Sequence, residues 1–399
     1  MIRASHRRSG IALSRVLLAV VASLLLILLA AFVFVPRALD RRLNRVVGAA
    51  APEPSSHART LFASLRVADL HADPLLWDRD LGERHPYGHV DLPRLLEGNV
   101  ALQVFGIVTQ APLGQNFESN DADAPDLITL VAALERWPRA TWTSKLERVL
   151  HQARRLDELA ARSEGRLTVI HSAADLHAFF AKRAENPQTV AGVLGIEGAH
   201  ALEGKLENLE RVFDAGVRML GLAHFVDNEV AGSSAGAGKH GLTPLGREVV
   251  RRMEELGIAV DLAHASPATI DDVLAIAREP VVVSHGGLQS VCPGPRTLSD
   301  AHVRAIAATG GVIGIGFFQE TSCGTSPADV ARSIRAARDL AGVEHVALGS
   351  DFDGAVSTAF DTTGLAAVVD ALQTEGLRDD EIRLVMGENA LRVLGQTLP

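Results

Sequence analysis

Histidines and carboxylates, the side chains that commonly bind metal ions, recur where short apolar runs of this chain end. His264 and His285 close two such runs, 258–264 and 281–285, and a helix-like segment separates them. A strand, a crossover helix and a second strand form a βαβ unit whose strands lie parallel. Because parallel neighbours bring their C-terminal ends to the same edge of a sheet, we expect both histidines to face one cleft. This arrangement favours a shared metal ion.

Five more side chains of the same kinds end other apolar runs. His71 and Asp73 are two positions apart in a strand-like run, so their side chains point the same way and can hold one ion together. Glu197 ends another run, and a buried carboxylate there needs a cation or several hydrogen-bond donors. His224 and Asp351 end two further runs. The pattern is much more specific than any single residue in it.

The runs that carry these residues predict the fold. Eight strand-like runs, most of them separated by helical stretches such as 144–162, 243–256 and 301–309, indicate an α/β protein built as a (β/α)8 TIM-like barrel. Catalytic groups of such barrels lie at the C-terminal ends of the strands. The eight runs are 66–73, 99–109, 189–197, 217–224, 258–264, 281–285, 312–317 and 346–351.

The N-terminal segment 1–45 differs from the rest of the chain. It holds eight arginines and one acidic residue, although the whole chain carries a formal net charge of −9. Within it, residues 16–35 are uncharged, and a helix of this length spans about 30 Å, the thickness of a bilayer's hydrocarbon core. We therefore expect a transmembrane anchor, with a cytoplasmic N-terminus and a barrel outside the cytoplasm. A cleaved signal peptide is the less favoured alternative, because the exit from the run is a poor cleavage site.

Composition limits the remaining possibilities. Small, polar and proline-containing residues over 46–57 predict a linker, which leaves 58–399 as the barrel domain. The acidic body argues against a nucleic-acid partner. Cys292 and Cys323 are the only cysteines, so we expect no disulfide framework and no cysteine zinc motif. The glycine-rich stretch 232–241 lacks the spacing of a nucleotide-binding loop and is interpreted as a flexible active-site loop.

The candidate residues are sufficient for two metal ions. Imidazole and carboxylate ligands suit Zn²⁺, with Mn²⁺, Co²⁺ and Fe²⁺ as alternatives. A carboxylate can bridge two ions about 3.5–4 Å apart, and a water held between them loses a proton near neutral pH to become a nucleophile. A nearby carboxylate can then pass a proton to a leaving amine. The chemistry implied is hydrolysis of an amide or an ester.

Several motifs, in order along the chain, resemble the membrane (renal) dipeptidase family, which are zinc dipeptidases of the amidohydrolase superfamily. The resemblance runs from about residue 67 to 393 and implies that His71 and Asp73 hold one zinc ion. It further implies that His264 and His285 hold the other and that Glu197 bridges the two. The motifs are DLHAD, GIEGAH, GVRMLGLAH, GLTPLGREVVRRMEELGIAVDLAHAS, PVVVSHGG and GSDFDG.

The resemblance also implies roles toward the substrate. His224 would contact the substrate carbonyl or the tetrahedral intermediate, and Asp351 would shuttle the proton and meet the free amino group. Arg296 would bind the terminal carboxylate through its guanidinium. Without the resemblance, Arg296 is an ordinary loop arginine. Asp353, two positions past Asp351, is an alternative for the proton shuttle.

The function expected from these residues is that of a metallodipeptidase, which cleaves dipeptides by attack of a metal-bridging hydroxide. A related dinuclear amidohydrolase acting on N-acyl amino acids or lactams is one alternative, and a non-catalytic ligand-binding barrel is another. The segment after His224 and the pair Gly286-Gly287 depart from the mammalian pattern, which leaves the substrate side chains undefined. A homodimer also stays open. His200, three residues after Glu197, is the other histidine best placed to join the site.

Overall fold

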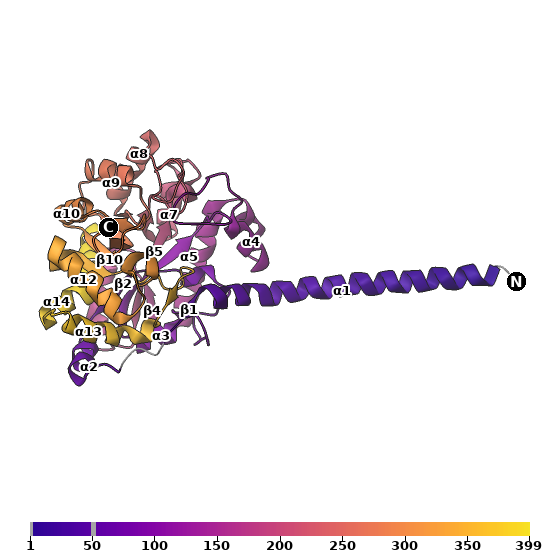
Figure 1. The fold of residues 1–399 in the computed structure, drawn as a ribbon, viewed down its shortest axis with the longest axis horizontal. Helices are drawn as coiled ribbons and strands as arrows, with labels where there is room; N and C mark the ends of the chain where they lie inside the picture. Colours follow the sequence, from indigo (N-terminus) through magenta and orange to yellow (C-terminus); the bar gives the residue numbers. More distant parts are fainter. Residues whose placement is uncertain (1–2, 49–52) are drawn as a thin grey trace.

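A closed barrel of eight parallel strands forms the body of the protein. The computed structural model describes residues 3–48 and 53–399, and Figure 1 shows helices surrounding the strands. The strands follow one another in chain order around the barrel, and pairing of β8 with β10 and of β11 with β2 closes it. The predicted (β/α)8 barrel is therefore confirmed. Its strands are β2 (Val67–Ala72), β3 (Val100–Val108), β5 (Val190–Glu197), β6 (Val217–Gly221), β7 (Ala259–Asp261), β8 (Val282–Leu288), β10 (Val312–Ile315) and β11 (Val346–Leu348).

The strands are apolar along most of their length because both of their faces are covered. Every residue of β3 and of β5 is buried. Leu102 and Val104 belong to one hydrophobic cluster, whereas Phe105 and Ile107 belong to another. Since side chains alternate along a strand, the two clusters lie on opposite faces of the sheet. Polar residues in these strands consequently stand out, and most of them lie at the site described below.

Helices begin at polar caps, as local sequence chemistry predicts. Ser144 caps α5 (Lys145–Arg162) and Thr243 caps α8 (Pro244–Leu256), each by accepting a hydrogen bond from a backbone N–H of the first turn. Together with α10 (Asp300–Ala308), these confirm the predicted helical stretches. The other helices are α2 (Ser56–Ala63), α3 (Leu92–Glu97), α4 (Leu127–Leu134), α6 (Ala173–Arg183), α7 (Asn208–Asp214), α9 (Pro267–Leu274), α11 (Gln319–Ser322), α12 (Pro327–Ala341), α13 (Leu365–Thr374), α14 (Asp379–Arg383) and α15 (Asn389–Thr397).

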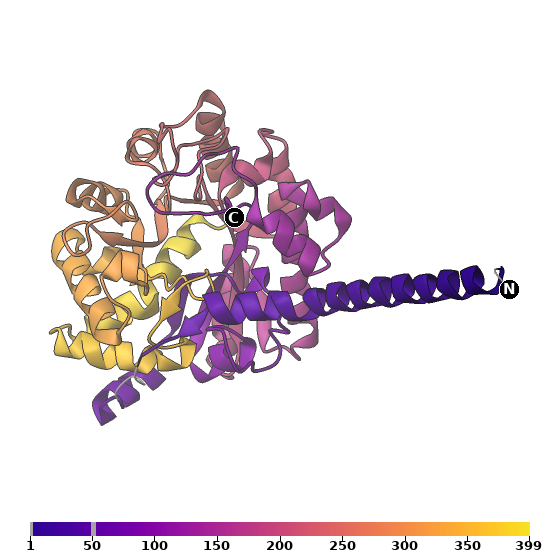
Figure 2. The ribbon, with the colours of Figure 1, turned by 45° about the vertical axis from the view of Figure 1, so that its right-hand side comes forward.

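The N-terminal helix α1 (Arg3–Leu43) contains the predicted membrane span and projects from the barrel (Figures 1 and 2). Within the described residues, no helix combines enough length with enough apolar character to cross a membrane. The predicted transmembrane helix over 16–35 is therefore not supported. After α1, the short strand β1 (Arg45–Val46) pairs with β12 (Ser357–Thr358). Residues 49–52 of the predicted linker lie outside the described residues.

Three short features complete the fold. Strand β4 (Leu167–Val169) pairs with β5, and β9 (Thr297–Leu298) pairs with β8. Cys292 and Cys323 form a disulfide that joins the loop after β8 to the end of α11. The sequence analysis expected no disulfide framework and missed this bridge. The two cysteines are 31 positions apart and carry no spacing motif.

Candidate metal centre and active site

The candidate metal ligands meet at the C-terminal ends of the barrel strands. His71 is the second-last residue of β2 and Asp73 directly follows this strand, whereas Glu197 is the last residue of β5 and His285 lies within β8. His224, His264 and Asp351 each lie three residues beyond the end of a strand, namely β6, β7 and β11. All seven side chains are buried and lie within one contact network, which is described below.

Glu197 lies at the centre of this network. Its Oε1 atom lies 3.3 Å from Nε2 of His71, 3.2 Å from Nε2 of His264 and 3.3 Å from Nε2 of His285. Its Oε2 atom lies 3.0 Å from Nε2 of His224. One carboxylate therefore contacts four imidazoles that come from four different strands or strand ends. This is the position expected for a group that bridges two metal ions.

The hydrogen bonds of His285 show that its Nε2 atom, which faces the centre, is an acceptor. The Ser284 hydroxyl donates to Oδ2 of Asp261 at 2.5 Å, so its oxygen accepts from Nδ1 of His285 at 3.0 Å. Burial lowers the pKa of His285 well below its usual value, so the ring is neutral and Nε2 carries no proton. That acceptor nitrogen faces the Glu197 carboxylate, and two acceptors repel each other unless a cation lies beside them. The arrangement fits a metal ion.

The opposite side of the centre also favours positive charge. Burial alone would lower the pKa of His71, but Asp73 and Glu197 outweigh it and raise this pKa well above its usual value. Oδ1 of Asp73 is buried without a hydrogen-bond partner among the described residues. Burial opposes ionisation of Glu197 as well, yet the neighbouring imidazoles hold its pKa well below the usual range. Here a metal ion can supply the charge that these carboxylates require.

Three overlapping sets of side chains place their ligand atoms close enough to share an ion. One set contains His71, Asp73 and Glu197, the residues of the predicted first site. Another contains Glu197, His224 and His264, and the third contains His71, His285 and Asp351. His264 and His285, predicted to share the second ion, approach to 3.0 Å between their Nε2 atoms. The division of ligands between two ions stays a prediction, with His224 and Asp351 near enough to take part.

Two buried Asp–Ser pairs support the ligands, and the sequence analysis did not identify them. Asp69 accepts from the backbone N–H of Ser350 at 2.8 Å and from its hydroxyl at 2.6 Å. Asp261 makes the same two contacts with Ser284, at 2.8 and 2.5 Å. Each pair ties together two neighbouring strands next to a candidate ligand. A carboxylate inside an apolar run, as in VADLHA and GIAVDLAH, is the signal that points to them.

Asp351 and Asp353 lie in different surroundings. Burial raises the pKa of Asp351 well above its usual range, only partly opposed by His71, and its Oδ1 atom lies 3.9 Å from Nε2 of His71. The Asp353 carboxylate instead pairs with Arg79 at 2.7 Å and accepts from the backbone N–H of His89 at 2.7 Å. These contacts occupy the Asp353 carboxylate. The alternative in which Asp353 replaces Asp351 as the proton shuttle is therefore not supported.

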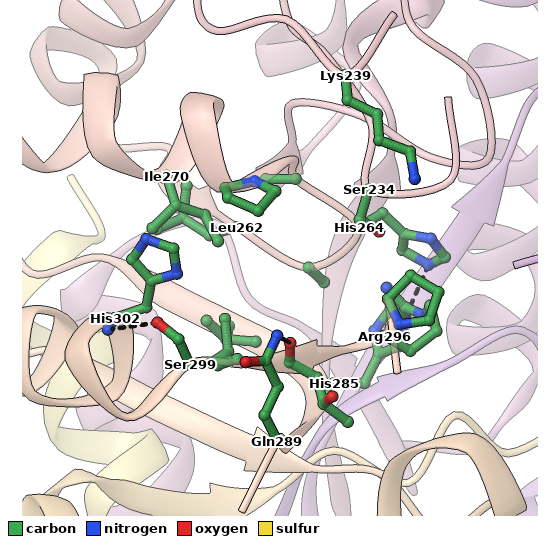
Figure 3. Close-up of a pocket in the computed structure, with 18 residues that line it drawn as sticks. Ser234, Lys239, Leu262, His264, Ile270, His285, Gln289, Arg296, Ser299 and His302 are labelled. Atoms are coloured by element: carbon green, nitrogen blue, oxygen red, sulfur yellow. Dashed lines mark hydrogen bonds between the residues drawn. The ribbon is translucent and has the colours of Figure 1, made fainter. Parts of the chain in front are cut away.

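Arg296 lines a cavity of about 280 Å³ beside the metal centre. Figure 3 shows Arg296 near His264 and His285, with His302 at the far side of the cavity. Although Arg296 is only 5% exposed, its Nε and Nη2 atoms have no hydrogen-bond partner among the described residues. None of the 18 residues that line the cavity is an aspartate or a glutamate. A carboxylate of a ligand would satisfy this guanidinium.

The glycine-rich stretch 232–241, predicted to be an active-site loop, does lie at the site. Its residues Ser234 and Lys239 line the cavity. The backbone N–H of Ser234 donates to the carbonyl of His264 at 2.7 Å, and an isolated bridge joins Ser233 to Ala265. These contacts with the segment that carries His264 hold the loop beside the metal centre.

His200, the further histidine singled out in the sequence, also lies close to the centre. It is buried, and neither of its ring nitrogens has a partner among the described residues. Burial lowers its pKa well below the usual value, so the ring is neutral. Its ring stacks against that of His224 with 6.5 Å between the centroids. His200 therefore lies beside the metal-capable sets and belongs to none of them.

A glycine on β3 gives a direct test of the metal site. A Cβ atom at Gly106 would lie 2.0 Å from Oδ1 of Asp73 and 2.8 Å from Cε1 of His71. We predict that Gly106→Ala displaces Asp73 and weakens metal binding by about tenfold or more, measured as metal retained per chain after dialysis. Gly395→Ala, at a position where a Cβ meets nothing within 4 Å, is the matched control. Unchanged metal retention in Gly106→Ala would show that Asp73 is not a ligand.

Comparison with known proteins places this site in a family. The model of the membrane dipeptidase family, peptidase family M19, matches residues 55–398. A dipeptidase of Aspergillus oryzae is 29% identical over 350 residues, which are 82% of this chain and 77% of that protein. A solved metallopeptidase from Rhodobacter sphaeroides, bound to a phosphinate mimic of the dipeptide L-Ala-D-Ala, is 26% identical with a TM-score of 0.67, covering 84% of this chain and 99% of its own. A solved dipeptidase described as a metallopeptidase of family M19 is also 26% identical with a TM-score of 0.68 and the same coverage. The chain therefore belongs to the membrane dipeptidase family, peptidase family M19.

Proposed function

We propose that this protein is a metallodipeptidase that hydrolyses the peptide bond of dipeptides. One observation carries the proposal, namely that two complementary features adjoin each other. The Glu197 carboxylate contacts four imidazoles. In the cavity beside it, Nε and Nη2 of the buried Arg296 have no hydrogen-bond partner among the described residues. The first feature suits a metal centre and the second suits a substrate carboxylate. The dipeptidase relatives and the dipeptide mimic bound to the Rhodobacter sphaeroides enzyme support the same activity.

We infer that two Zn²⁺ ions are the cofactors. His71 and Asp73 would hold one ion, His264 and His285 the other, and Glu197 would contact both. Neutral imidazoles and carboxylates are ligands that zinc accepts readily, although Mn²⁺, Co²⁺ and Fe²⁺ share them. When bound, such ions lower the pKa of a water toward neutrality and polarise a substrate carbonyl.

The remaining side chains would orient the substrate and move its proton. Nδ1 of His224 donates to the carbonyl of Gln110 at 2.9 Å, which fixes the ring with Nε2 turned toward the centre. From there, the His224 ring would contact the substrate carbonyl oxygen, on which negative charge develops during the reaction. Asp351 would accept a proton from the attacking water and pass it to the nitrogen of the leaving amine. Its raised pKa suits a group that must both accept and release a proton.

The charged side chains around the centre would bind both ends of a dipeptide. Asp351 and Asp73 lie on the side of His71, where an ammonium group is favoured. Arg296 lies in the acid-free cavity beside His264 and His285, where a carboxylate is favoured. A substrate that meets both groups has its free amino group and its free carboxylate on either side of one peptide bond. Such a site would favour dipeptides over longer peptides.

Replacement of Arg296 tests that assignment. We predict that Arg296→Ala raises KM for a dipeptide about tenfold or more, because the carboxylate loses a charge-assisted hydrogen bond. KM for the corresponding dipeptide amide should change little, since the amide offers no carboxylate. Steady-state kinetics on the two substrates measures the difference, with Arg304→Ala on the exposed face of α10 as the control. Equal losses for both substrates would contradict the carboxylate role.

We also propose that the barrel lies outside the cytoplasm. The Cys292–Cys323 disulfide supports this location, because disulfides persist mainly in oxidising compartments. Attachment to a membrane and assembly into a homodimer stay predictions. Alkylation of free thiols in intact cells, followed by mass spectrometry, should find both cysteines unlabelled and joined to each other. Labelling of both thiols without prior reduction would contradict the proposed location.

A further inference from the structure

The C-terminal end of α1 is buried against the barrel, although α1 lies outside the region that defines the family. The family model begins at residue 55, whereas α1 ends at residue 43. Asp40 and Asn44 nevertheless are only 2% and 1% exposed. Figures 1 and 2 both show this end of α1 against the barrel, with the rest of the helix projecting away. One face of this end of α1 is therefore buried against the barrel, whereas Arg41 and Arg42 on the same turn are exposed.

Asp40 connects α1 to the active-site loop through Arg79. Oδ2 of Asp40 lies 2.7 Å from Nε of Arg79, and Nη2 of Arg79 lies 2.7 Å from Oδ2 of Asp353. The side chains of Arg79 and Asp353 are fully buried, and that of Asp40 is 2% exposed. Water does not screen these ion pairs, and loss of either partner would leave buried charge or donors unsatisfied.

Asn44 makes a second connection, which is joined to the first through Asp40. Its side-chain amide donates to Oδ1 of Asp40 at 2.8 Å, and its Oδ1 atom accepts from the backbone N–H of Ala355 at 2.9 Å. Just beyond Asn44, β1 pairs with β12, and the backbone N–H of Val47 donates to the carbonyl of Thr358 at 2.7 Å. The end of α1 and β1 therefore hold the segment from Asp353 to Thr358 at several points.

This segment adjoins Asp351, and its backbone needs external support. Asp351, Asp353 and Ala355 have φ values of 60°, 63° and 60°, in the left-handed region that disfavours residues with a Cβ atom. Such conformations persist only where surrounding contacts determine them. The space is also tight, because a Cβ atom at Gly354 would lie 2.0 Å from Oδ1 of Asp351. A small shift of this backbone would consequently move the Asp351 carboxyl group.

The barrel supplies part of the support, since the backbone N–H of Asp351 donates to the carbonyl of His71 at 3.1 Å and that of Asp73 to the carbonyl of Phe352 at 2.8 Å. His89 and Val90 donate their backbone N–H groups to the Asp353 carboxylate, and the indole of Trp77 donates to its carbonyl. Arg79 lies between Asp353 and Asp40, and its Nη1 atom also donates to the carbonyl of Val90 at 3.2 Å. The contact of Ala355 with Asn44 comes from the end of α1.

We propose that the C-terminal end of α1 positions Asp351, through Asp40 with Arg79 and through Asn44 with Ala355. The inference rests on the proposed function, in which Asp351 moves the proton. Asp40 and Asn44 are positioning residues, since neither touches the metal-capable side chains. The end of α1 would then contribute to catalysis by positioning Asp351, although it lies outside the barrel.

Kinetics of the full-length, metal-loaded protein test the proposal. Burial raises the pKa of Asp40 to about 6, so the carboxylate is ionised in assays at about pH 8. We expect Asp40→Asn to lower kcat about tenfold, with KM within about twofold of wild type and the metal content unchanged. Asp40→Glu keeps the charge and should recover part of kcat. Arg41→Gln and Arg42→Gln, exposed on the same helix, should leave kcat unchanged. A purely structural role would instead lower the metal content together with kcat, and that result would overturn the proposal.

Amide hydrogen exchange gives a readout that does not depend on activity. The N–H of Ala355 should exchange faster in Asn44→Ala and in Asp40→Asn than in the wild type, and Asp351→Asn should leave it unchanged. The proposal is overturned if exchange at Ala355 stays the same in both variants, or if kcat of Asp40→Asn stays within about twofold of wild type. A wild-type protein that cleaves no dipeptide would refute the proposed function, and the exchange result would still decide whether α1 holds the loop.

Discussion

The Glu197 carboxylate, buried among four imidazoles, is the interaction on which the rest of this structure depends. A carboxylate loses much hydration energy when it is buried, and only charge or hydrogen bonds close to it can offset that loss. The four histidines around Glu197 come from β2, β6, β7 and β8 or the residues that follow them. The closed parallel barrel brings these strand ends to one point. The candidate metal centre therefore depends on closure of the barrel.

The two sides of this centre differ in charge, and that asymmetry matches the substrate. Around His71 the neighbours are carboxylates, which raise its pKa. Around His264 and His285 the rings are neutral, because burial lowers both pKa values, and the nearby charge is that of Arg296. A dipeptide carries its ammonium group and its carboxylate on opposite sides of one bond. The proposed orientation places each end of the dipeptide beside the opposite charge.

Sequence patterns could predict the barrel and most of the centre for a simple physical reason. Strands covered on both faces are apolar, so a polar residue such as Glu197 at the end of a strand has few explanations other than a site. The supporting pairs escaped prediction because the contact of Asp69 with Ser350 joins residues that only the closed barrel brings together. Asp40 likewise appears as an isolated acid in a basic segment until Arg79 is seen beside it. The disulfide was missed because two cysteines 31 positions apart form no motif that indicates pairing.

Metal analysis of Glu197→Gln tests the central claim most directly. The amide keeps the size of the side chain but removes the charge that four imidazoles share. Wild-type protein should retain about two metal equivalents per chain after dialysis, as a dinuclear site requires. If Glu197 contacts both ions, Glu197→Gln should lose both together while the barrel stays folded by circular dichroism. Retention of the wild-type metal content in this variant would contradict the account.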